Sequence, residues 1–579
     1  MNHRTPLGLA LAAATLLGLS ACGGDDAALA VNAPATTPTT FSGTAATGAA
    51  MANATVSISC VSGSGTATTA ANGSYTTNIA NVTLPCVLKA ASSDGNTVLY
   101  SVTAAASTGA QVANITPLTQ LLVASLAGTE PGTFFTNFST TSSSLTASSV
   151  SAAQAAVLTT LRNAGLDVST LSELLTGTLV AATSTSTGNA YDVVLDALKV
   201  QLTQSGTTLA TLTTSVAAAS PAVTTTTNAA SSVASLPASL LLKTAASSCP
   251  ALRSTDYFIA APTPGGTLAD QFDSFSLNAG TLATANSDGS AVTLVASSDA
   301  CHFTSSSSDL EMVVSPAGVI LARSLENGLR RMRVAIPKQT FAVAELAGTW
   351  NALNFEKNNA GLYAGHLLTA TIGSTGVFSD VSYCESASPA AICAAPSTTI
   401  TVSSNSAGGF NIIGSGTDNW TDRAFAYRAG NGSLMLLSVS EDGSQTIWTK
   451  KRTLSLPTAA TVFGKSWSIF ANSSAIASSL NTSYTSTFTS SDAAANSYIR
   501  TVNLASGTPD YSETILINSP RDGYNFRDAG TATSTSTGLN VPIRKRTSLG
   551  LHGMGVSVQS VPTQTDITAE RFQVTVEQS

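Results

Sequence analysis

Residues 54–60 read ATVSISC, and this stretch decides the fold because its apolar and hydroxyl side chains alternate strictly. Successive side chains of a strand point to opposite faces of a sheet, so the apolar residues at 54, 56, 58 and 60 share one face. The same period of two returns at residues 84–90, LPCVLKA, with Val87 as an exception, and at residues 98–102, VLYSV. Asp94-Gly95 between these two runs predicts a hairpin turn. Residues 41–115 are therefore expected to form a β-sandwich.

A short motif runs through the same region. Residues 41–43, FSG, are followed by residues 54–56, ATV, and then by residues 68–75, TTAANGSY. This order resembles the carboxypeptidase regulatory-like (transthyretin-like) β-sandwich family, whose signature is a Gly, then A-x-V, then T-x-x-x-G-x-Y. Asn53 and Asn72 stand where that family often has Gly and Asp, and Asn also suits turns. The resemblance implies a small spacer or binding module without catalytic activity.

Residues 116–248 change to a helical period. Thr116-Pro117 combines an N-cap residue with Pro at the first helical position, and leucines at helical spacing follow as far as Leu126. A second helix is expected over residues 151–164, ending at Gly165. The third, from Tyr191, carries the clearest apolar stripe, and a fourth covers residues 209–216. This pattern favours a packed helical bundle over a cofactor-binding segment.

Residues 249–579 return to the period of strands and contain a faint internal repeat. Three stretches open with an aromatic strand, at residues 256–259, 348–351 and 464–467, and three close with a basic residue entering alternating apolar positions, at residues 333–337, 452–457 and 571–576. We predict three related antiparallel β units, barrel- or sandwich-like, over residues 249–342, 343–460 and 461–579. Residues 348–350, GTW, resemble the G-x-W start of lipocalin-type barrels. The predicted fold class is mainly β with a helical middle segment, and unlike topologies in the three units would refute the repeat.

The first 22 residues have the features of a targeting segment. Residues 3–4 are basic, residues 7–19 are apolar and uncharged, and small residues lead to Cys22. This arrangement resembles a bacterial lipobox, which implies a lipid on Cys22 after cleavage and anchoring in a membrane. By the rule for enteric bacteria, Gly23 in place of Asp directs such a lipoprotein to the outer membrane, on a face that the sequence leaves open. Residues 23–40 have no apolar period and are expected to be a flexible tether.

The cysteine count agrees with an extracytoplasmic location. Without Cys22, six of the seven cysteines remain, which is the even number expected for disulfides in an oxidising compartment. Pairing of neighbours in sequence suggests three bridges, although sequence alone does not decide among the connectivities that six cysteines allow. The suggested pairs are Cys60–Cys86, which would cross the sandwich core, Cys249–Cys301 and Cys384–Cys393. Zinc binding is disfavoured, because only Cys301-His302 places a thiol beside an imidazole.

Composition excludes several classes of function. Only 10% of residues are charged and the net charge is −7, which argues against a nucleic-acid-binding protein. The sequence contains no nucleophile elbow, HExxH motif, phosphate-binding loop or dinucleotide fingerprint. Four histidines leave little capacity for general-base catalysis at neutral pH. We therefore expect no catalytic residue, no metal and no cofactor, and we explain the four Asp-Gly pairs as hairpin turns rather than calcium loops.

Charged and aromatic residues concentrate in a few places. Residues 521–528, RDGYNFRD, form the best candidate recognition loop, in which Arg521, Tyr524, Phe526 and Arg527 are the candidate ligand-binding residues. An Arg–Asp turn network is the alternative explanation. Basic clusters at residues 330–333, 450–452 and 544–546 would meet an anionic lipid or glycan if they faced one way, or would instead solubilise edge strands.

These observations predict a non-catalytic, lipid-anchored outer-membrane protein. Its partners are the membrane, through the anchor, and a macromolecular ligand of the envelope or surface, bound through the C-terminal β units. The alternatives are a structural scaffold of the periplasmic envelope and, less favoured, a hydrolase with an unrecognised site.

Overall fold

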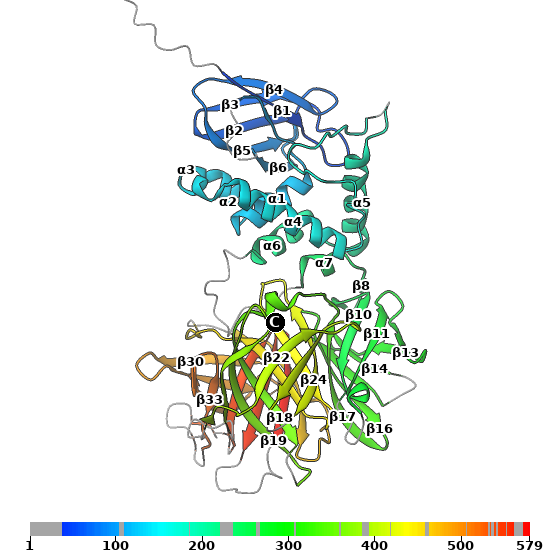
Figure 1. Ribbon diagram of the computed structural model, residues 1–579, viewed down its shortest axis with the longest axis vertical. Coiled ribbons are helices and arrows are strands. Elements are labelled where there is room, and N and C mark those ends of the chain that lie inside the picture. The colour runs from blue at the N-terminus through cyan, green and yellow to red at the C-terminus, as the bar shows by residue number, and fades with distance from the viewer. Residues whose placement is uncertain are drawn as a thin grey trace, which may run out of the picture.

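The computed structural model describes most of the chain from residue 38 to residue 578. Residues outside the description are 1–37, 104–108, 184–185, 221–235, 262–266, 306–308, 358–359, 385–392, 417–418, 458–461, 484, 505, 531–532, 534–537, 540–541, 543, 552, 561–570 and 579. The predicted signal peptide and almost all of the predicted tether therefore lie outside it. Among the described helices, none combines the length and apolar character needed to cross a membrane. Figure 1 shows a sandwich, a helical layer and the β units arranged along the long axis.

The N-terminal part is a β-sandwich of two sheets, with strand orders β4-β1-β7 and β3-β2-β5-β6. Neighbouring strands are antiparallel except for β1 and β7, which are parallel. Its strands are β1 (Thr39–Thr44), β2 (Thr55–Ser62), β3 (Ser64–Thr68), β4 (Ser74–Ile79), β5 (Thr83–Ala91), β6 (Val98–Val102) and β7 (Gln111–Val112). The alternating residues of β2 and β5 meet in one buried core. Gly95, at φ 72°, forms the turn of the β5–β6 hairpin, as expected from Asp94-Gly95.

Two expectations for the sandwich need correction. Cys60 and Cys86 face each other on neighbouring strands of one sheet, so their disulfide does not cross the core from sheet to sheet. Val87 is no irregularity, because β5 is buried on both faces and Val87 packs against the helices. A strand between two layers carries apolar residues in both phases.

Seven α-helices form the middle layer within the described residues. They are α1 (Pro117–Ala127), α2 (Pro131–Thr136), α3 (Phe138–Thr141), α4 (Ala147–Asn163), α5 (Ala190–Ser205), α6 (Leu209–Ala218) and α7 (Ala238–Leu241), with a short 3-10 turn at Ser142–Ser144; two further 3-10 turns, Leu268–Gln271 and Val343–Leu346, lie in the β units. Thr116 caps α1 as predicted, and α4 begins four residues before the predicted start because Thr146 supplies its N-cap. The apolar stripe of α5 is buried in one core that also contains residues of α1, α4 and α6 and Val87 and Val102 of the sandwich.

The first β unit is a closed barrel in which each strand pairs with the next and the first pairs with the last. Its strands are β10 (Thr255–Ala260), β11 (Phe272–Asn278), β12 (Ala283–Asn286), β13 (Ala291–Ala296), β14 (His302–Ser305), β15 (Glu311–Val314), β16 (Ile320–Glu326) and β17 (Leu329–Pro337). The short pair β8 (Ala245–Ala246) and β9 (Cys249–Arg253) precedes it. One face of these strands fills the barrel around Tyr257 and Phe303.

The second β unit is a nine-stranded antiparallel sheet of order β21-β20-β19-β18-β26-β25-β24-β23-β22. Its strands are β18 (Gly348–Lys357), β19 (Tyr363–Ile372), β20 (Phe378–Cys384), β21 (Cys393–Ala394), β22 (Thr399–Ser404), β23 (Phe410–Ser415), β24 (Trp420–Arg428), β25 (Leu434–Ser440) and β26 (Gln445–Lys450). The sheet curls until its edges meet at one end, where the Val402 amide donates to the Gly376 carbonyl at 2.8 Å. It is thus a nearly closed barrel.

The third β unit is a ten-stranded sheet of order β27-β30-β31-β32-β33-β34-β35-β36-β28-β29. Its strands are β27 (Val462–Phe463), β28 (Lys465–Asn472), β29 (Asn481–Ser483), β30 (Ser486–Asp492), β31 (Ser497–Asn503), β32 (Pro509–Ile517), β33 (Asn525–Arg527), β34 (Lys545–Leu551), β35 (Met554–Ser560) and β36 (Arg571–Gln578). Here again an early strand, β28, pairs with the last strand, β36.

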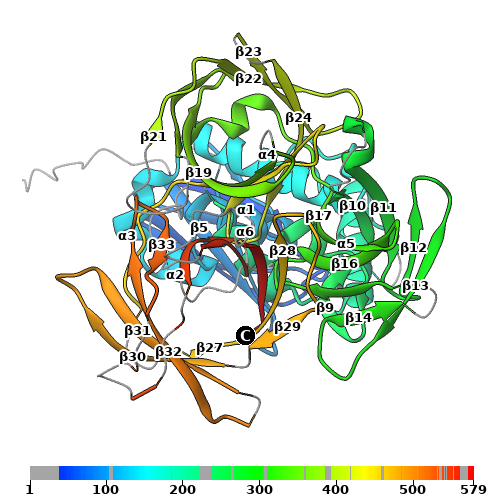
Figure 2. The same ribbon diagram turned by 90° about the horizontal axis from the view of Figure 1, so that it is seen from below.

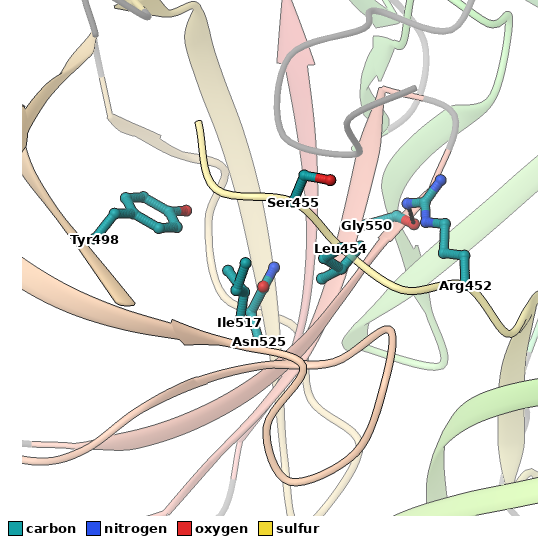
Figure 3. Close-up of a pocket in the computed structure, with 7 residues that line it drawn as sticks. All are labelled: Arg452, Leu454, Ser455, Tyr498, Ile517, Asn525 and Gly550. Atoms are coloured by element: carbon teal, nitrogen blue, oxygen red, sulfur yellow. Dashed lines mark hydrogen bonds between the residues drawn. The ribbon is translucent and has the colours of Figure 1, made fainter. Parts of the chain in front are cut away.

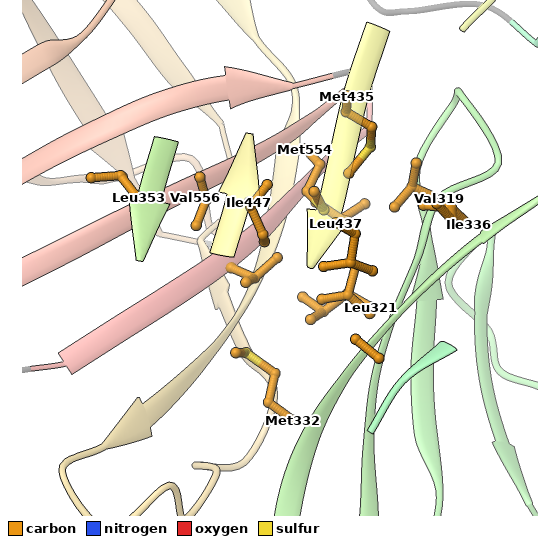
Figure 4. Close-up of a cluster of buried hydrophobic side chains, with 14 of the residues drawn as sticks. Val319, Leu321, Met332, Ile336, Leu353, Met435, Leu437, Ile447, Met554 and Val556 are labelled. Carbon is orange, nitrogen blue, oxygen red and sulfur yellow. The ribbon is translucent and has the colours of Figure 1, made fainter. Parts of the chain in front are cut away.

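Figure 2 shows the three units from below, grouped side by side, and their buried side chains form one shared apolar core. Each contributes the face of its strands that points away from its own interior. Figure 4 shows this core, with residues from the first unit (Val319, Leu321, Met332, Ile336), the second (Leu353, Met435, Leu437, Ile447) and the third (Met554, Val556). These side chains are almost completely buried. Because separating the units would expose them to water, we expect the C-terminal half to unfold as one cooperative unit rather than as three independent domains.

The mainly β fold class with a helical middle is confirmed, and the strand path bears on the predicted repeat. In every unit the predicted opening segment pairs with the final strand. The closing strand of the second unit was placed wrongly, however. That strand is β26, and residues 451–457 leave the sheet as an extended segment without strand pairing. The shared path fits a repeat, while the degree of closure differs among the units.

Candidate ligand-binding site

The described part of the chain contains the three disulfides suggested by sequence. Cys60–Cys86 joins β2 to β5, Cys249–Cys301 joins β9 to the turn before β14, and Cys384–Cys393 joins β20 to β21. The sulfur of Cys301 is thus part of a disulfide, which leaves Cys301-His302 without a thiolate for zinc. Cys22, the candidate lipidation site, lies outside the described residues.

Residues 521–528 comprise the end of the turn after β32 and the strand β33, and they do not form a free recognition loop. Tyr524 is fully buried, and its hydroxyl lies 3.0 Å from both the amide and the carbonyl of Ala352 and donates to the Leu368 carbonyl at 2.6 Å. Arg521 reaches Thr369 Oγ1 at 3.4 Å and Cys384 Sγ at 3.4 Å. These two side chains join the third unit to the second, so burial argues against their predicted role in ligand binding.

The two remaining candidates of this segment are also buried. Phe526 and Arg527 are each 6% exposed. Arg527 donates through Nη1 to Glu513 Oε2 at 2.7 Å and through Nη2 to the Arg544 carbonyl at 3.0 Å. The Arg–Asp turn network considered for this segment is in fact an Arg–Glu cluster that extends over four strands.

Glu513 is the centre of that cluster. Its side chain is fully buried on β32, and Oε1 lies 2.6 Å from Arg500 Nη2 and 3.1 Å from Arg546 Nη2. Strand pairing explains the assembly, because Arg500 faces Glu513 across β31–β32 and Arg527 faces Arg546 across β33–β34. Burial by itself raises the pKa of Glu513, but the three guanidinium groups outweigh it and hold this pKa well below its usual range.

The cluster carries more positive than negative charge. Three guanidinium groups surround the Glu513 carboxylate, and the Glu577 charge also acts on Arg500, so guanidinium groups still outnumber carboxylates at this cluster on the inner face of the third unit. Arg527 Nε and Arg546 Nε are buried and have no hydrogen-bond partner among the described residues. Buried cations with unused donors favour an anion nearby.

The rest of this inner face is polar as well. Residues on β28, β35 and β36 form a buried hydrogen-bonded network in which Gln573 Nε2 donates to Ser468 Oγ at 2.8 Å and to Thr575 Oγ1 at 3.0 Å. Gln559 and Ser557 complete the network on β35. The third unit therefore differs from the first, whose interior is apolar.

A shallow hollow of about 290 Å³, much of it open to solvent, lies on this face, and its lining residues Tyr498 and Asn525 stand two positions along their strands from Arg500 and Arg527 of the Arg–Glu cluster. Figure 3 shows how side chains from β31 to β34 and from residues 452–455 converge on it. Its lining residues are Arg452, Leu454, Ser455, Tyr498, Ile517, Asn525 and Gly550. Asn525 Oδ1 is buried without a hydrogen-bond partner among the described residues. The hollow combines a guanidinium group, hydroxyl and amide groups and an apolar floor.

Residues 451–457 form one wall of the hollow. Asn518 fixes this segment through its amide group, which accepts from the Leu454 amide at 2.7 Å and donates to the Leu454 carbonyl at 2.8 Å. Arg452 donates to the Gly550 carbonyl at 3.0 Å. Leu454 then packs into a small apolar cluster with Tyr498 and Ile517. The alternation of apolar and polar residues at 452–457 therefore results from this packing and does not mark a strand.

The basic clusters do not form one anionic-ligand surface. Arg331 and Arg333 are 9% and 7% exposed, and Arg331 Nη1 donates to the Ala475 carbonyl at 2.9 Å in the third unit. Lys450 Nζ donates to the Leu346 carbonyl at 2.8 Å and lies 4.4 Å from the Trp350 ring centroid. Both earlier interpretations, a common anion-binding face and solubilising edge residues, are therefore wrong for these three side chains. They hold neighbouring segments together instead.

The arrangement is suited to binding rather than to acid–base chemistry. Burial lowers the pKa of Arg527 and of Arg452. Both side chains nevertheless remain protonated at neutral pH, because guanidinium is the conjugate acid of a strong base. No group of three or more His, Cys, Asp or Glu residues suited to a metal ion occurs within the described ranges. His302 lies against Trp467 between the first and third units, with Nδ1 2.8 Å from Ser297 Oγ. The centroids of the two rings are 5.7 Å apart, and His302 is not among the residues that line the hollow.

Comparison with known proteins gives little guidance. No protein-family model and no curated protein matches the chain. Among solved structures, isotype 1 transferrin binding protein B from serogroup B Neisseria meningitidis is 10% identical with a TM-score of 0.18, over 54% of this chain and 66% of that chain. A mutant transferrin binding protein B from Haemophilus parasuis Hp5 is 8% identical with a TM-score of 0.18, over 56% of this chain and 76% of that chain. Similarity this low establishes neither a shared fold nor a shared ligand.

Proposed function

We propose that the chain is a lipid-anchored, non-catalytic binding protein of the bacterial outer membrane. The lipobox-like segment ending at Cys22 supports the anchor, and three disulfides suit an oxidising compartment. In this proposal the N-terminal sandwich is a carboxypeptidase regulatory-like spacer. It and the helical layer hold the β units away from the membrane.

The ligand proposed for the third unit is an anionic, hydroxyl-rich group of an envelope or surface macromolecule. The observation that carries this proposal is the guanidinium group of Arg452 in the lining of the hollow, with the three guanidinium groups of the Arg–Glu cluster on the same face of the sheet. A carboxylate or similar anion in the hollow would accept hydrogen bonds from Arg452 and be attracted by the charge of the cluster. Ser455, Tyr498 and Asn525 would contact the neighbouring hydroxyl groups.

Titration with a carboxylated oligosaccharide tests the proposal. We expect oligogalacturonate to bind the full-length protein, and maltotetraose, which lacks the carboxylates, to bind at least tenfold more weakly. Arg452→Gln should weaken oligogalacturonate binding at least tenfold, because Arg452 lines the hollow. Lys451→Gln is the matched control, since Lys451 is exposed and adjacent in sequence. Equal affinity for the two oligosaccharides, or equal loss in both variants, would contradict the proposed site.

The anchor is tested separately. Cys22→Ala should abolish incorporation of a labelled fatty acid and release the protein from the membrane fraction. Retained labelling in that variant would contradict lipidation at Cys22.

A further inference from the structure

A second polar site lies inside the second β unit, at one end of its nearly closed barrel. The strands β18, β19, β20, β24, β25 and β26 direct one face inward. Near one end this inner face is apolar, with Trp350, Phe378 and Leu434 in contact. Toward the other end, the positions on this same inward face are occupied by polar residues, namely Asn354, Glu356, His366, Tyr383 and Asp422. Polar residues in the inward phase of so many strands need a reason, because burying them costs free energy.

Glu356, His366 and Tyr383 lie together on three neighbouring strands. Tyr383 donates its hydroxyl to Glu356 Oε2 at 3.0 Å, and His366 Nδ1 is 3.9 Å from the same oxygen. The rings of His366 and Tyr383 stack with centroids 5.0 Å apart. Burial raises the pKa of Glu356 and lowers the pKa of His366 to about 4, so the imidazole is neutral at pH 7.

Asp422 occupies the opposite side of the same end. It is 8% exposed and accepts a hydrogen bond from Ser440 Oγ at 2.6 Å. Burial, with smaller contributions from the Asp442 and Glu356 charges, raises the pKa of Asp422 to about 7. Three carboxyl groups, those of Glu356, Asp422 and Asp442, are therefore close enough to repel one another.

No basic side chain offsets this charge within the described residues. None of the three carboxyl groups forms an ion pair with Lys or Arg there, and Glu356 Oε2 instead has the Tyr383 hydroxyl at 3.0 Å and the neutral His366 imidazole at 3.9 Å. Asn354 Oδ1 and His366 Nδ1 are buried and have no hydrogen-bond partner in the same part of the chain. Hydroxyl groups of Tyr383 and Ser440 donate to Glu356 and Asp422, but within the described residues no cation is paired with the three carboxyl groups.

The rim of this end carries an aromatic ring. Trp420 begins β24 in the same phase as Asp422 and is 37% exposed, whereas Trp350, Trp448 and Trp467 are buried. Across the pair, Gly414 has no side chain, and a Cβ there would lie 2.3 Å from the Trp420 ring. The bare glycine lets the indole lie flat against the sheet at the barrel mouth. Aromatic faces attract cations, more so when the cation is desolvated.

We propose that this end of the second unit's barrel binds an alkylammonium group, through Glu356, Asp422 and the acceptors Asn354 and His366. An ammonium group supplies three donors and one positive charge, which matches the unused acceptors and the unpaired carboxyl groups. Its alkyl chain would extend past Trp420 and Tyr383. The source is either a free amine or a lysine side chain of a protein partner. This site is distinct from the hollow of the third unit, and neither depends on the other.

Isothermal titration of the full-length protein with n-pentylammonium tests the proposal at pH 8. We expect saturable binding of one equivalent, and no binding of 1-pentanol, which has the same chain without the charge. Glu356→Gln should weaken binding at least tenfold, while Asp510→Asn, at an exposed position on β32, should not. The Glu356 side chain lies in the barrel end, where surrounding protein desolvates its carboxyl group, but 42% of its surface is exposed, so Gln at this position leaves the packed core unchanged.

Proton release gives a second readout. Near pH 6.5 part of Asp422 is protonated, and binding of a cation should expel that proton to the buffer. The enthalpy of binding should then vary with the ionisation enthalpy of the buffer, and Asp422→Asn should remove this variation. Absence of any saturable ammonium binding, or equal affinity in Glu356→Gln and wild type, would overturn the proposal. A buffer-independent enthalpy would overturn the assignment of Asp422.

Two further probes distinguish the sources. Tighter binding of Nα-acetyl-lysine methylamide than of n-pentylammonium would support a lysine side chain of a partner. The reverse order would support a free amine. If neither n-pentylammonium nor Nα-acetyl-lysine methylamide binds while oligogalacturonate still does, the ammonium site is overturned and the function proposed for the third unit is unaffected.

Discussion

Replacing Asp422 by Asn should change how the stability of the protein depends on pH. Asp422 is buried in the second unit, where its pKa is raised from 3.8 to about 7. A carboxyl group with a raised pKa binds more protons in the folded state than in the unfolded state between these two values. Its contribution to the free energy of unfolding is therefore complete below about pH 4 and is lost as the pH rises through 7.

The magnitude follows from the size of the shift. Each pKa unit corresponds to about 1.4 kcal/mol, so a shift of roughly three units corresponds to about 4 kcal/mol between pH 4 and pH 8. With an unfolding entropy of about 2 cal/mol/K per residue, a cooperative body of roughly 330 residues would shift in Tm by at most about 6 °C. Asn retains the acceptor for the Ser440 hydroxyl but cannot ionise, so the variant should lack this loss.

Calorimetric Tm values at half-unit steps from pH 4 to pH 8 measure the effect. We expect the Tm of the variant relative to that of wild type to rise steadily with pH, so that the variant is the more stable protein at pH 8. Asp510→Asn, which removes an exposed carboxyl group, should follow the wild-type curve. Parallel curves for Asp422→Asn and wild type would refute the reasoning, because they would mean that Asp422 titrates alike in both states.

Two further substitutions test buried polar contacts of the third unit. Glu513→Gln leaves three buried guanidinium groups without their carboxylate and should lower the free energy of unfolding by about 3 kcal/mol or more in urea titration, whereas Glu441→Gln, at an exposed turn position, should have little effect. An unchanged midpoint for Glu513→Gln would mean that water screens the cluster. Tyr524→Phe removes the hydroxyl that bonds to Ala352 and Leu368 in the second unit and should cost about 1–3 kcal/mol, measured by the same titration. No loss in that variant would show that these bonds do not stabilise the junction between the units.

Local patterns in the sequence were sufficient to predict much of the fold. Alternation at residues 54–60 and 84–90 depends only on neighbouring positions, and so does the cap at Thr116. The three aromatic opening segments were also correctly predicted to be strands. Each has a buried aromatic side chain, and this burial does not depend on which strand pairs with it. Residues 452–457 show the limit of this approach. Their alternation is real, but it arises from packing of Leu454 against the third unit, which no local pattern distinguishes from strand pairing.

The candidate sites were harder to predict because they depend on register between distant strands. Residues 521–528 attracted attention through their composition, yet Tyr524 and Arg527 serve contacts inside the protein. Glu513 gave no such signal, since its three arginine partners come from strands that only the sheet order brings together. A usable signal did exist in the second unit. On β18 the inward phase runs from Trp350 through Ala352 to Asn354 and Glu356, so a change from apolar to polar within one phase marks the polar end of a barrel.

The placement of charge in this chain supports the two proposed binding sites. Only 10% of residues are charged, yet several of them are buried in two separate places of opposite sign. Buried ion clusters seldom stabilise a protein more than apolar residues of the same size would. The first unit shows that this architecture closes well around an apolar interior. The polar interiors of the second and third units are therefore not needed to form a barrel, and ligand binding gives a physical reason for them that fold stability does not.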